Sequence, residues 1–103
     1  MSEYLEDVQR YDSGANDETV AKIVKHLGIA LRGRDSSLVS CTDTSELDRV
    51  REKWSMKKLG ETDVSACDDI IGKVCEEMSG ERNKSRVTFY YLVAKHHGKL
   101  GSL

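Results

Sequence analysis

The sequence predicts an all-α fold, a single small bundle of about five helices with an apolar C-terminal helix at its centre. Three observations support this. The 103 residues include no proline, so the chain lacks the residue type that most often breaks helices. Apolar residues recur at helical spacings in several segments, and capping residues or glycines bound those segments. The length suits one domain over residues 1–103, with loosely held ends at 1–3 and 99–103.

The first two expected helices each carry one apolar face. Residues 2–12 begin at Ser2, a good capping residue, and residues 17–32 follow Asn16, another one. Gly28 lies inside the second helix, where glycine costs about 1 kcal/mol relative to alanine, so we expect a close helix crossing there. The apolar positions are Tyr4, Leu5, Val8 and Tyr11 in the first helix and Val20, Ile23, Val24, Leu27 and Leu31 in the second.

A third helix is predicted by the capping-box pattern "DTSE" at residues 43–46. In this pattern the side chain of Asp43 caps the helix, and the side chain of Glu46 reaches back to the backbone N–H of Asp43. The helix is expected to run to about Leu59. Trp54, the sole tryptophan, is expected to anchor the core rather than to form a platform for a ligand.

A fourth helix over residues 64–78 is predicted by an apolar seam with alternating spacings of three and four, which is typical of a bundle. Thr62 or Asp63 is expected to cap it. Two cysteines lie on or beside the seam, where a thiol packs as a small apolar group. The seam consists of Val64, Cys67, Ile71, Val74 and Met78, and Cys75 widens it.

The C-terminal run over residues 85–97 is ambiguous, because its aromatic and β-branched residues favour strands. A strand needs a partner, and only the short stretch 38–41 offers one, which would give a marginal two-stranded ribbon. As a helix, the run has Ser85 as its cap and Gly98 just past its end. Its apolar residues lie on nearly all sides, which predicts a central helix. Residues 38–41 are then expected to form a buried connector or one helical turn.

Charge is unevenly distributed along the chain. The net charge of −2 disfavours a general binder of nucleic acid or of acidic membranes. Residues 81–103, however, hold 5 Lys/Arg and 1 Asp/Glu. We favour the interpretation that this basic segment complements the acidic body of the same molecule.

The cysteines and the N-terminal residues predict a cytoplasmic location. Three cysteines without paired spacing do not indicate the disulfide framework of a secreted protein, and Cys41 is expected to be the most exposed of them. The acidic N-terminal stretch does not resemble a signal peptide. No apolar stretch approaches the ~20 residues that cross a bilayer, so we expect no membrane partner.

The strongest candidate site is a basic cluster for a phosphate or carboxylate at the start of the C-terminal helix. The N terminus of a helix favours negative charge, and basic residues flank it here. The cluster would consist of Arg32, Arg34, Lys84, Ser85 and Arg86. The competing interpretation, which we favour, is that the arginines pair with carboxylates of the same molecule.

No motif predicts catalysis, a metal or another cofactor. The spacings of histidine, cysteine and acidic residues match no zinc motif, and no nucleophile or phosphate-loop motif occurs. The adjacent His96 and His97 would point about 100° apart on a helix, so they do not easily hold one ion. We expect no catalytic residue and no cofactor.

Four stretches resemble, in order, a bacterial family known as domain of unknown function 2853. The resemblance covers nearly the whole chain and implies a small, stand-alone, mostly helical bacterial protein. It implies no activity, cofactor or partner. The stretches are "IVKHLGIALRGRDSSLVSC" (23–41), "RVREKW" (49–54), "KKLG" (57–60) and "KSRVTFYYLVAKHHGKLG" (84–101).

These observations favour a non-catalytic protein-interaction or regulatory module with an unidentified protein partner. It would use an exposed helix face or the basic C-terminal surface, and it could complete a thin core by forming a homodimer. The alternative is a binder of anions or nucleic acid that uses the basic residues at the start of the C-terminal helix. The negative net charge counts against nucleic acid.

Overall fold

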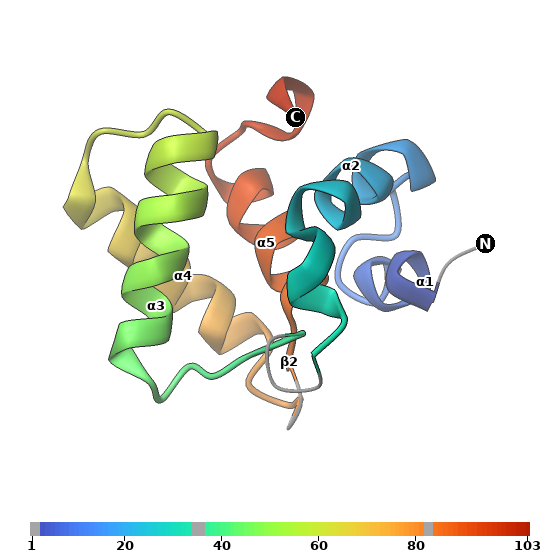
Figure 1. The fold of residues 1–103 in the computed structure, drawn as a ribbon, viewed down its shortest axis with the longest axis horizontal. Helices are drawn as coiled ribbons and strands as arrows, with labels where there is room; N and C mark the ends of the chain where they lie inside the picture. Colours follow the sequence, from blue (N-terminus) through green and yellow to red (C-terminus); the bar gives the residue numbers. More distant parts are fainter. Residues whose placement is uncertain (1–2, 34–36, 82–83) are drawn as a thin grey trace.

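The computed structural model describes residues 3–33, 37–81 and 84–103. In these residues the chain forms a compact, mostly helical globule, which confirms the predicted fold class (Figure 1). A π-helix, η2 (Arg51–Lys58), continues the third α-helix without a break, and two 3₁₀ turns, η1 (Gly28–Leu31) and η3 (Leu100–Ser102), follow α2 and α5. The α-helices are α1 (Glu3–Gln9), α2 (Asp17–Leu27), α3 (Thr44–Val50), α4 (Val64–Glu77) and α5 (Arg86–His96).

Helix α5 lies at the centre of the molecule. Every residue from Arg86 to Ala94 is buried, and the helix contacts α1, α2, α4 and η2. Figure 1 shows α1 and α2 on one side of it and α3 and α4 on the other. The prediction of a central C-terminal helix is therefore confirmed. Ser85 occupies its N-cap position, but contrary to expectation its side chain makes no capping hydrogen bond.

Two hydroxyl groups of α5 form hydrogen bonds with the N-terminal segment. The Thr88 hydroxyl donates to the carboxylate of Asp7 in α1, and the Tyr91 hydroxyl donates to Asp12 over 2.7 Å. Helix α1 ends at Gln9, earlier than the expected residue 12. The expected cap Ser2 lies outside the described residues.

Helix α2 also ends earlier than predicted, at Leu27 instead of about residue 32. Its start is as expected, because the Asn16 side chain accepts a hydrogen bond of 2.8 Å from the Thr19 backbone. Gly28 has a φ of +46°, which L residues rarely adopt, and its N–H closes the helix on Val24. The expected close helix crossing at Gly28 is wrong: nothing lies within 4 Å of where a Cβ would sit.

The third helix runs from Thr44 to Lys58 as predicted, but its second half is a π-helix. Asp43 caps it by accepting from the backbone of Ser45 and Glu46. The Glu46 side chain forms an ion pair with Arg86 instead of completing a capping box. Asp63 caps α4 through the Ala66 N–H, at 3.1 Å.

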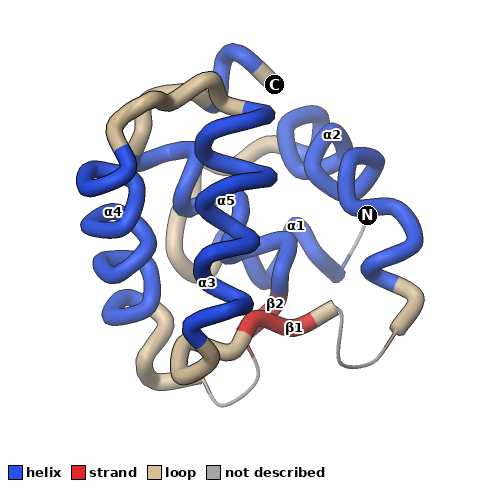
Figure 2. The backbone as a smooth tube through the Cα atoms, turned by 60° about the vertical axis from the view of Figure 1, so that its left-hand side comes forward, coloured by secondary structure: helices blue, strands red, loops and turns tan. Residues whose placement is uncertain are grey.

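A short antiparallel ladder lies beside the start of α5 (Figure 2). It pairs β1 (Leu38–Val39) with β2 (Lys84–Ser85), residue Leu38 facing Ser85. The expectation of a connector or helical turn at residues 38–41 is therefore wrong for its first two residues. The ladder forms because the chain enters α5 in an extended conformation that offers its edge to residues 38–39. None of the helices in the described ranges combines the length and apolar character that crossing a membrane requires.

Candidate anion-binding site

The predicted basic cluster at the start of α5 is divided between the surface and the interior. Arg32 is exposed in the turn after η1, and Lys84 and Ser85 lie half-buried on β2. Arg86 is buried, only 6% exposed. Arg34 lies outside the described residues.

The Arg86 guanidinium is engaged within the molecule. It forms an ion pair with Glu46, and its Nη2 donates to the carbonyl oxygen of Leu38 over 2.9 Å. It also lies 5.8 Å from the centre of the Tyr90 ring, within the range of a cation–π contact. A buried charge must be paired and hydrogen-bonded to be tolerated. These contacts agree with the interpretation in which an arginine of the cluster pairs with a carboxylate of the same molecule.

A different basic site lies where the end of α2 approaches η2. Here a surface hollow of about 440 Å³ is lined by His26, Lys53, Lys57 and Lys58; we call it the basic hollow. His26 belongs to the last turn of α2, and the three lysines belong to η2. The basic hollow therefore joins two elements that are distant in the sequence.

Helix η2 has the hydrogen bonding of a π-helix, and it buries one side chain while it exposes three lysines. The N–H of Leu59 bonds the carbonyl oxygen of Trp54, five residues back, at 2.9 Å. A π-helix widens the turn, and such turns are frequent at functional sites. The Trp54 side chain is fully buried, whereas Lys53, Lys57 and Lys58 are exposed.

His26 lies against the tryptophan at the base of this region. The centres of the His26 and Trp54 rings are 5.0 Å apart, with the ring planes at 52°. His26 is exposed on one side, but partial desolvation, and to a lesser extent the positive charge of Lys58, lowers its pKa below the usual 6.5. His26 is therefore neutral at pH 7, and the lysines supply the charge of the basic hollow.

The lysines of the basic hollow differ from three other lysines of the protein. Lys22, Lys95 and Lys99 each lie within 4.0 Å of a carboxylate. No carboxylate in the described ranges pairs with the three lysines of the basic hollow, Lys53, Lys57 and Lys58. Like charges that converge on one concave surface concentrate the electrostatic potential there. The arrangement is suited to binding a small anion.

The sequence does contain a signal for this site, although the prediction did not use it. After Glu52, the stretch from Lys53 to Lys58 contains three lysines and no acidic residue. This pattern alone does not indicate a hollow, because lysines in the last turn of a helix also complement the helix dipole. The approach of His26 becomes visible only in the folded molecule.

The other histidines and the free cysteine have different surroundings. Among the described residues, no group of three histidine, cysteine or acidic side chains could hold a metal ion. His96 pairs with Glu77, and His97 lies 3.2 Å from Glu61. Cys67 is fully buried, and burial raises the pKa of its thiol, which makes the thiol less reactive.

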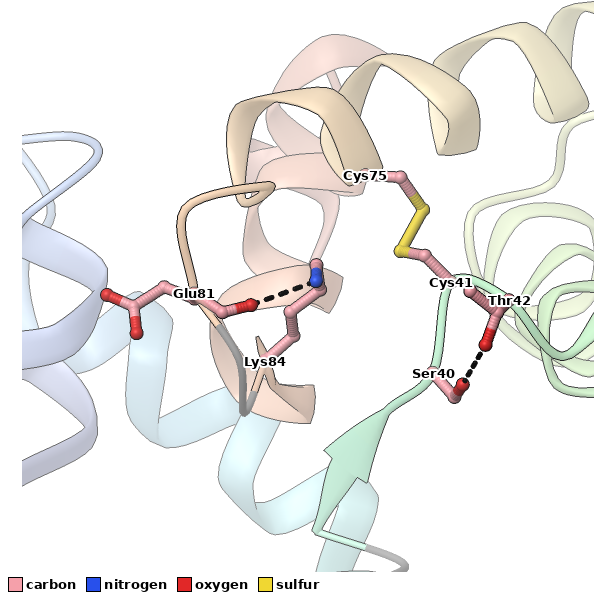
Figure 3. The surroundings of a disulfide bond; sticks show 6 residues. All are labelled: Ser40, Cys41, Thr42, Cys75, Glu81 and Lys84. Atoms are coloured by element: carbon pink, nitrogen blue, oxygen red, sulfur yellow. Dashed lines mark hydrogen bonds between the residues drawn. A yellow bond between two sulfur atoms is a disulfide. The ribbon is translucent and has the colours of Figure 1, made fainter.

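The expectation that Cys75 packs beside the seam of α4 as a small apolar thiol is wrong. Cys41 and Cys75 form a disulfide bond, with their Cα atoms 6.0 Å apart (Figure 3). Only the fold brings Cys75 beside Cys41, which lies 34 residues earlier in the chain.

Comparison with known proteins identifies one family. The family model described as "Protein of unknown function (DUF2853)" matches residues 3–101. No curated protein matches the chain.

Proposed function

Because the chain belongs to the DUF2853 family, whose description assigns no activity, we propose its function from the site itself: the basic hollow binds a small polyanion, such as a phosphorylated metabolite. The observation that carries the proposal is that Lys53, Lys57 and Lys58 line one hollow, and that no carboxylate within residues 3–33, 37–81 and 84–103 pairs with them. Three ammonium groups favour a ligand with two or more negative charges over a single carboxylate.

The size of the basic hollow supports a small ligand. Sites for small molecules commonly enclose about 300–1,000 Å³, and this hollow has about 440 Å³. A nucleic acid would need a longer basic stripe to contact successive phosphates. The net charge of −2 would also repel a long polyanion from the rest of the surface.

The proposed role is binding without catalysis. Among the described residues that line the basic hollow, His26 alone is of a type that ordinarily titrates near neutral pH, and it stands without a carboxylate or thiol beside it in that lining. Its neutral ring can donate or accept one hydrogen bond, which would orient a phosphate oxygen beside the lysines.

The role of a protein-interaction module, with or without a homodimer, stays a prediction. Among the described residues, Val64 is the single large hydrophobic side chain exposed to solvent, at 45%. A specific docking surface usually contains a larger apolar patch.

The proposal is tested by isothermal titration calorimetry with pyrophosphate as the probe. The double variant Lys57→Gln/Lys58→Gln should bind at least about tenfold more weakly than the unmodified protein, because it loses two of the three charges. The control Lys73→Gln/Lys84→Gln removes the same charge elsewhere, including one residue of the predicted basic cluster at α5. Equal weakening by both double variants, or no saturable binding, would contradict the proposal. DNA oligonucleotides in a second titration test the nucleic-acid alternative.

A further inference from the structure

The Cys41–Cys75 disulfide connects two parts of the molecule. Cys41 lies in the connector between β1 and α3, and Cys75 lies near the end of α4. The loop that the bond closes contains all of α3 and η2 and most of α4. Figure 3 shows the bond between the end of β1 and the helical ribbon of α4.

The two residues of the disulfide are partly exposed, unlike the third cysteine. Both Cys41 and Cys75 are half-buried, and both pack against the edge of the core. The third cysteine, Cys67, is fully buried and has a raised pKa, so it is protected from exchange. The disulfide-bonded cysteines are therefore partly exposed to solvent, and the free thiol is buried.

The surroundings of the bond are polar on one side. Lys84, Ser40 and Thr42 lie around it (Figure 3). The Lys84 ammonium donates to the carbonyl oxygen of Glu81 over 2.9 Å.

Apart from the disulfide, the connector over residues 40–43 is held by short-range contacts. The Ser40 hydroxyl lies 3.1 Å from that of Thr42, and the Asp43 N–H bonds the carbonyl oxygen of Ser40. Asp43 caps the helix that it precedes. The disulfide is the covalent tie between this connector and α4, so breaking it removes the constraint that fixes one against the other.

We propose that Cys41 and Cys75 form a reversible thiol–disulfide exchange site whose co-substrate is a low-molecular-weight thiol such as glutathione. A thiolate of the small thiol attacks one of the two sulfur atoms; the protein S–S bond breaks, a mixed disulfide forms, and the other cysteine leaves as a thiolate. A second small thiolate attacks the mixed disulfide and releases the second cysteine with one oxidised dimer of the small thiol. Two electrons pass to the protein, and the oxidised small thiol reverses the reaction.

The consequence is that the redox state controls the mobility of the connector. With the bond closed, residues 40–43 are fixed to α4. With the bond open, the connector loses its covalent link to α4 and is held by the β ladder, by the bond from Arg86 to the carbonyl oxygen of Leu38 and by its local contacts. Amide hydrogen exchange reports such local opening directly.

The test uses the folded protein in glutathione buffers of varied redox ratio, with rapid alkylation and mass spectrometry to count thiols. In excess reduced glutathione, two alkylated cysteines should appear, at Cys41 and Cys75, while Cys67 stays unmodified until the protein is denatured. Amide exchange at residues 40–43 should accelerate at least about tenfold on reduction. The Cys67→Ser variant should behave like the unmodified protein.

Two results would overturn the proposal. One is that the folded protein keeps the disulfide in excess reduced glutathione and loses it only in denaturant, which marks a permanent structural bond. The other is that all three thiols remain free in excess oxidised glutathione. The variant Cys41→Ser/Cys75→Ser supplies the open reference for amide exchange. If it does not fold, reduced and alkylated protein takes its place.

Discussion

The indole nitrogen of Trp54 donates a hydrogen bond of 2.9 Å to the backbone carbonyl oxygen of Tyr90. This bond joins the π-helix η2 to the central helix α5 at a fully buried position. The rings of the two residues also pack together, with their centres 4.8 Å apart. Because His26 packs against the same indole, Trp54 fixes the position of both elements that line the basic hollow.

Replacing the indole tests its structural role. Trp54→Phe removes the N–H donor and leaves a cavity, so we expect a loss of about 2–4 kcal/mol in the free energy of unfolding. Urea denaturation followed by circular dichroism measures it. Val64→Ala, at an exposed site, should cost less than about 1 kcal/mol. Equal losses in the two variants would show that Trp54 is not an anchor.

The buried ion pair of Arg86 and Glu46 gives a second prediction. Arg86→Met leaves the Glu46 carboxylate without its main partner, which should cost about 3–5 kcal/mol of unfolding free energy. Arg86→Met/Glu46→Leu removes both charges and should recover at least about half of that loss. Arg49→Met, which removes an exposed partner of Glu46, should cost less than about 1 kcal/mol. A double variant as unstable as Arg86→Met would contradict the paired-charge account.

The lowered pKa of His26 predicts a pH dependence of stability. Because the folded state holds His26 in its neutral form, the unfolded state binds more protons between the folded pKa and 6.5. The contribution of His26 to stability is therefore full above pH 6.5 and is lost as the pH falls through the folded pKa. His26→Gln should flatten this part of the stability profile. An unchanged pH profile of stability in this variant would show that His26 does not cause the loss of stability at low pH.

The same group predicts how anion binding varies with pH. A bound anion stabilises the protonated imidazole, so affinity should rise as the pH falls toward the pKa of His26. Sulfate is a suitable probe because its own charge is constant over this range. Trp54, the sole tryptophan and a neighbour of His26, reports binding by its fluorescence. In His26→Gln the pH dependence should disappear while weaker binding remains.

The disulfide predicts a redox dependence of global stability. Cys41 and Cys75 are 34 residues apart, and closing a loop of that length stabilises the folded state by about 3–4 kcal/mol in the chain-entropy account. Reduction should lower the free energy of unfolding by that amount in the unmodified protein and in Cys67→Ser. Cys41→Ser/Cys75→Ser should show no response to reductant. A response of similar size in that variant would assign the effect to something other than the disulfide.

The helices could be predicted because each depends on local chemistry. The apolar residues of α5 lie on all its sides, so only a central position buries them. Asn16, Asp43 and Asp63 form the predicted caps. The early end of α2 was missed because glycine is compatible with both a helix interior and a left-handed stop, and the φ of +46° at Gly28 decides between them.

The basic hollow and the disulfide could not be predicted because both depend on tertiary placement. His26 meets the lysines of η2 only after α2 and η2 pack against Trp54. Neither the π-helical register of η2 nor the proximity of Cys41 to Cys75 has a periodic signature in the sequence. The ion pair of Arg86 with Glu46 agrees with the favoured interpretation of the basic cluster at α5, but the sequence alone did not identify Glu46 as the partner.

The most direct test of the account maps where a polyanion binds. Pyrophosphate is titrated into isotopically labelled protein at about 0.1 M salt, and amide and indole shifts are followed by nuclear magnetic resonance. We expect the largest, saturating shifts at residues 25–27, at residues 53–58 and at the Trp54 indole. Shifts centred on residues 84–86, or small shifts spread over the surface without saturation, would contradict a binding site in the basic hollow.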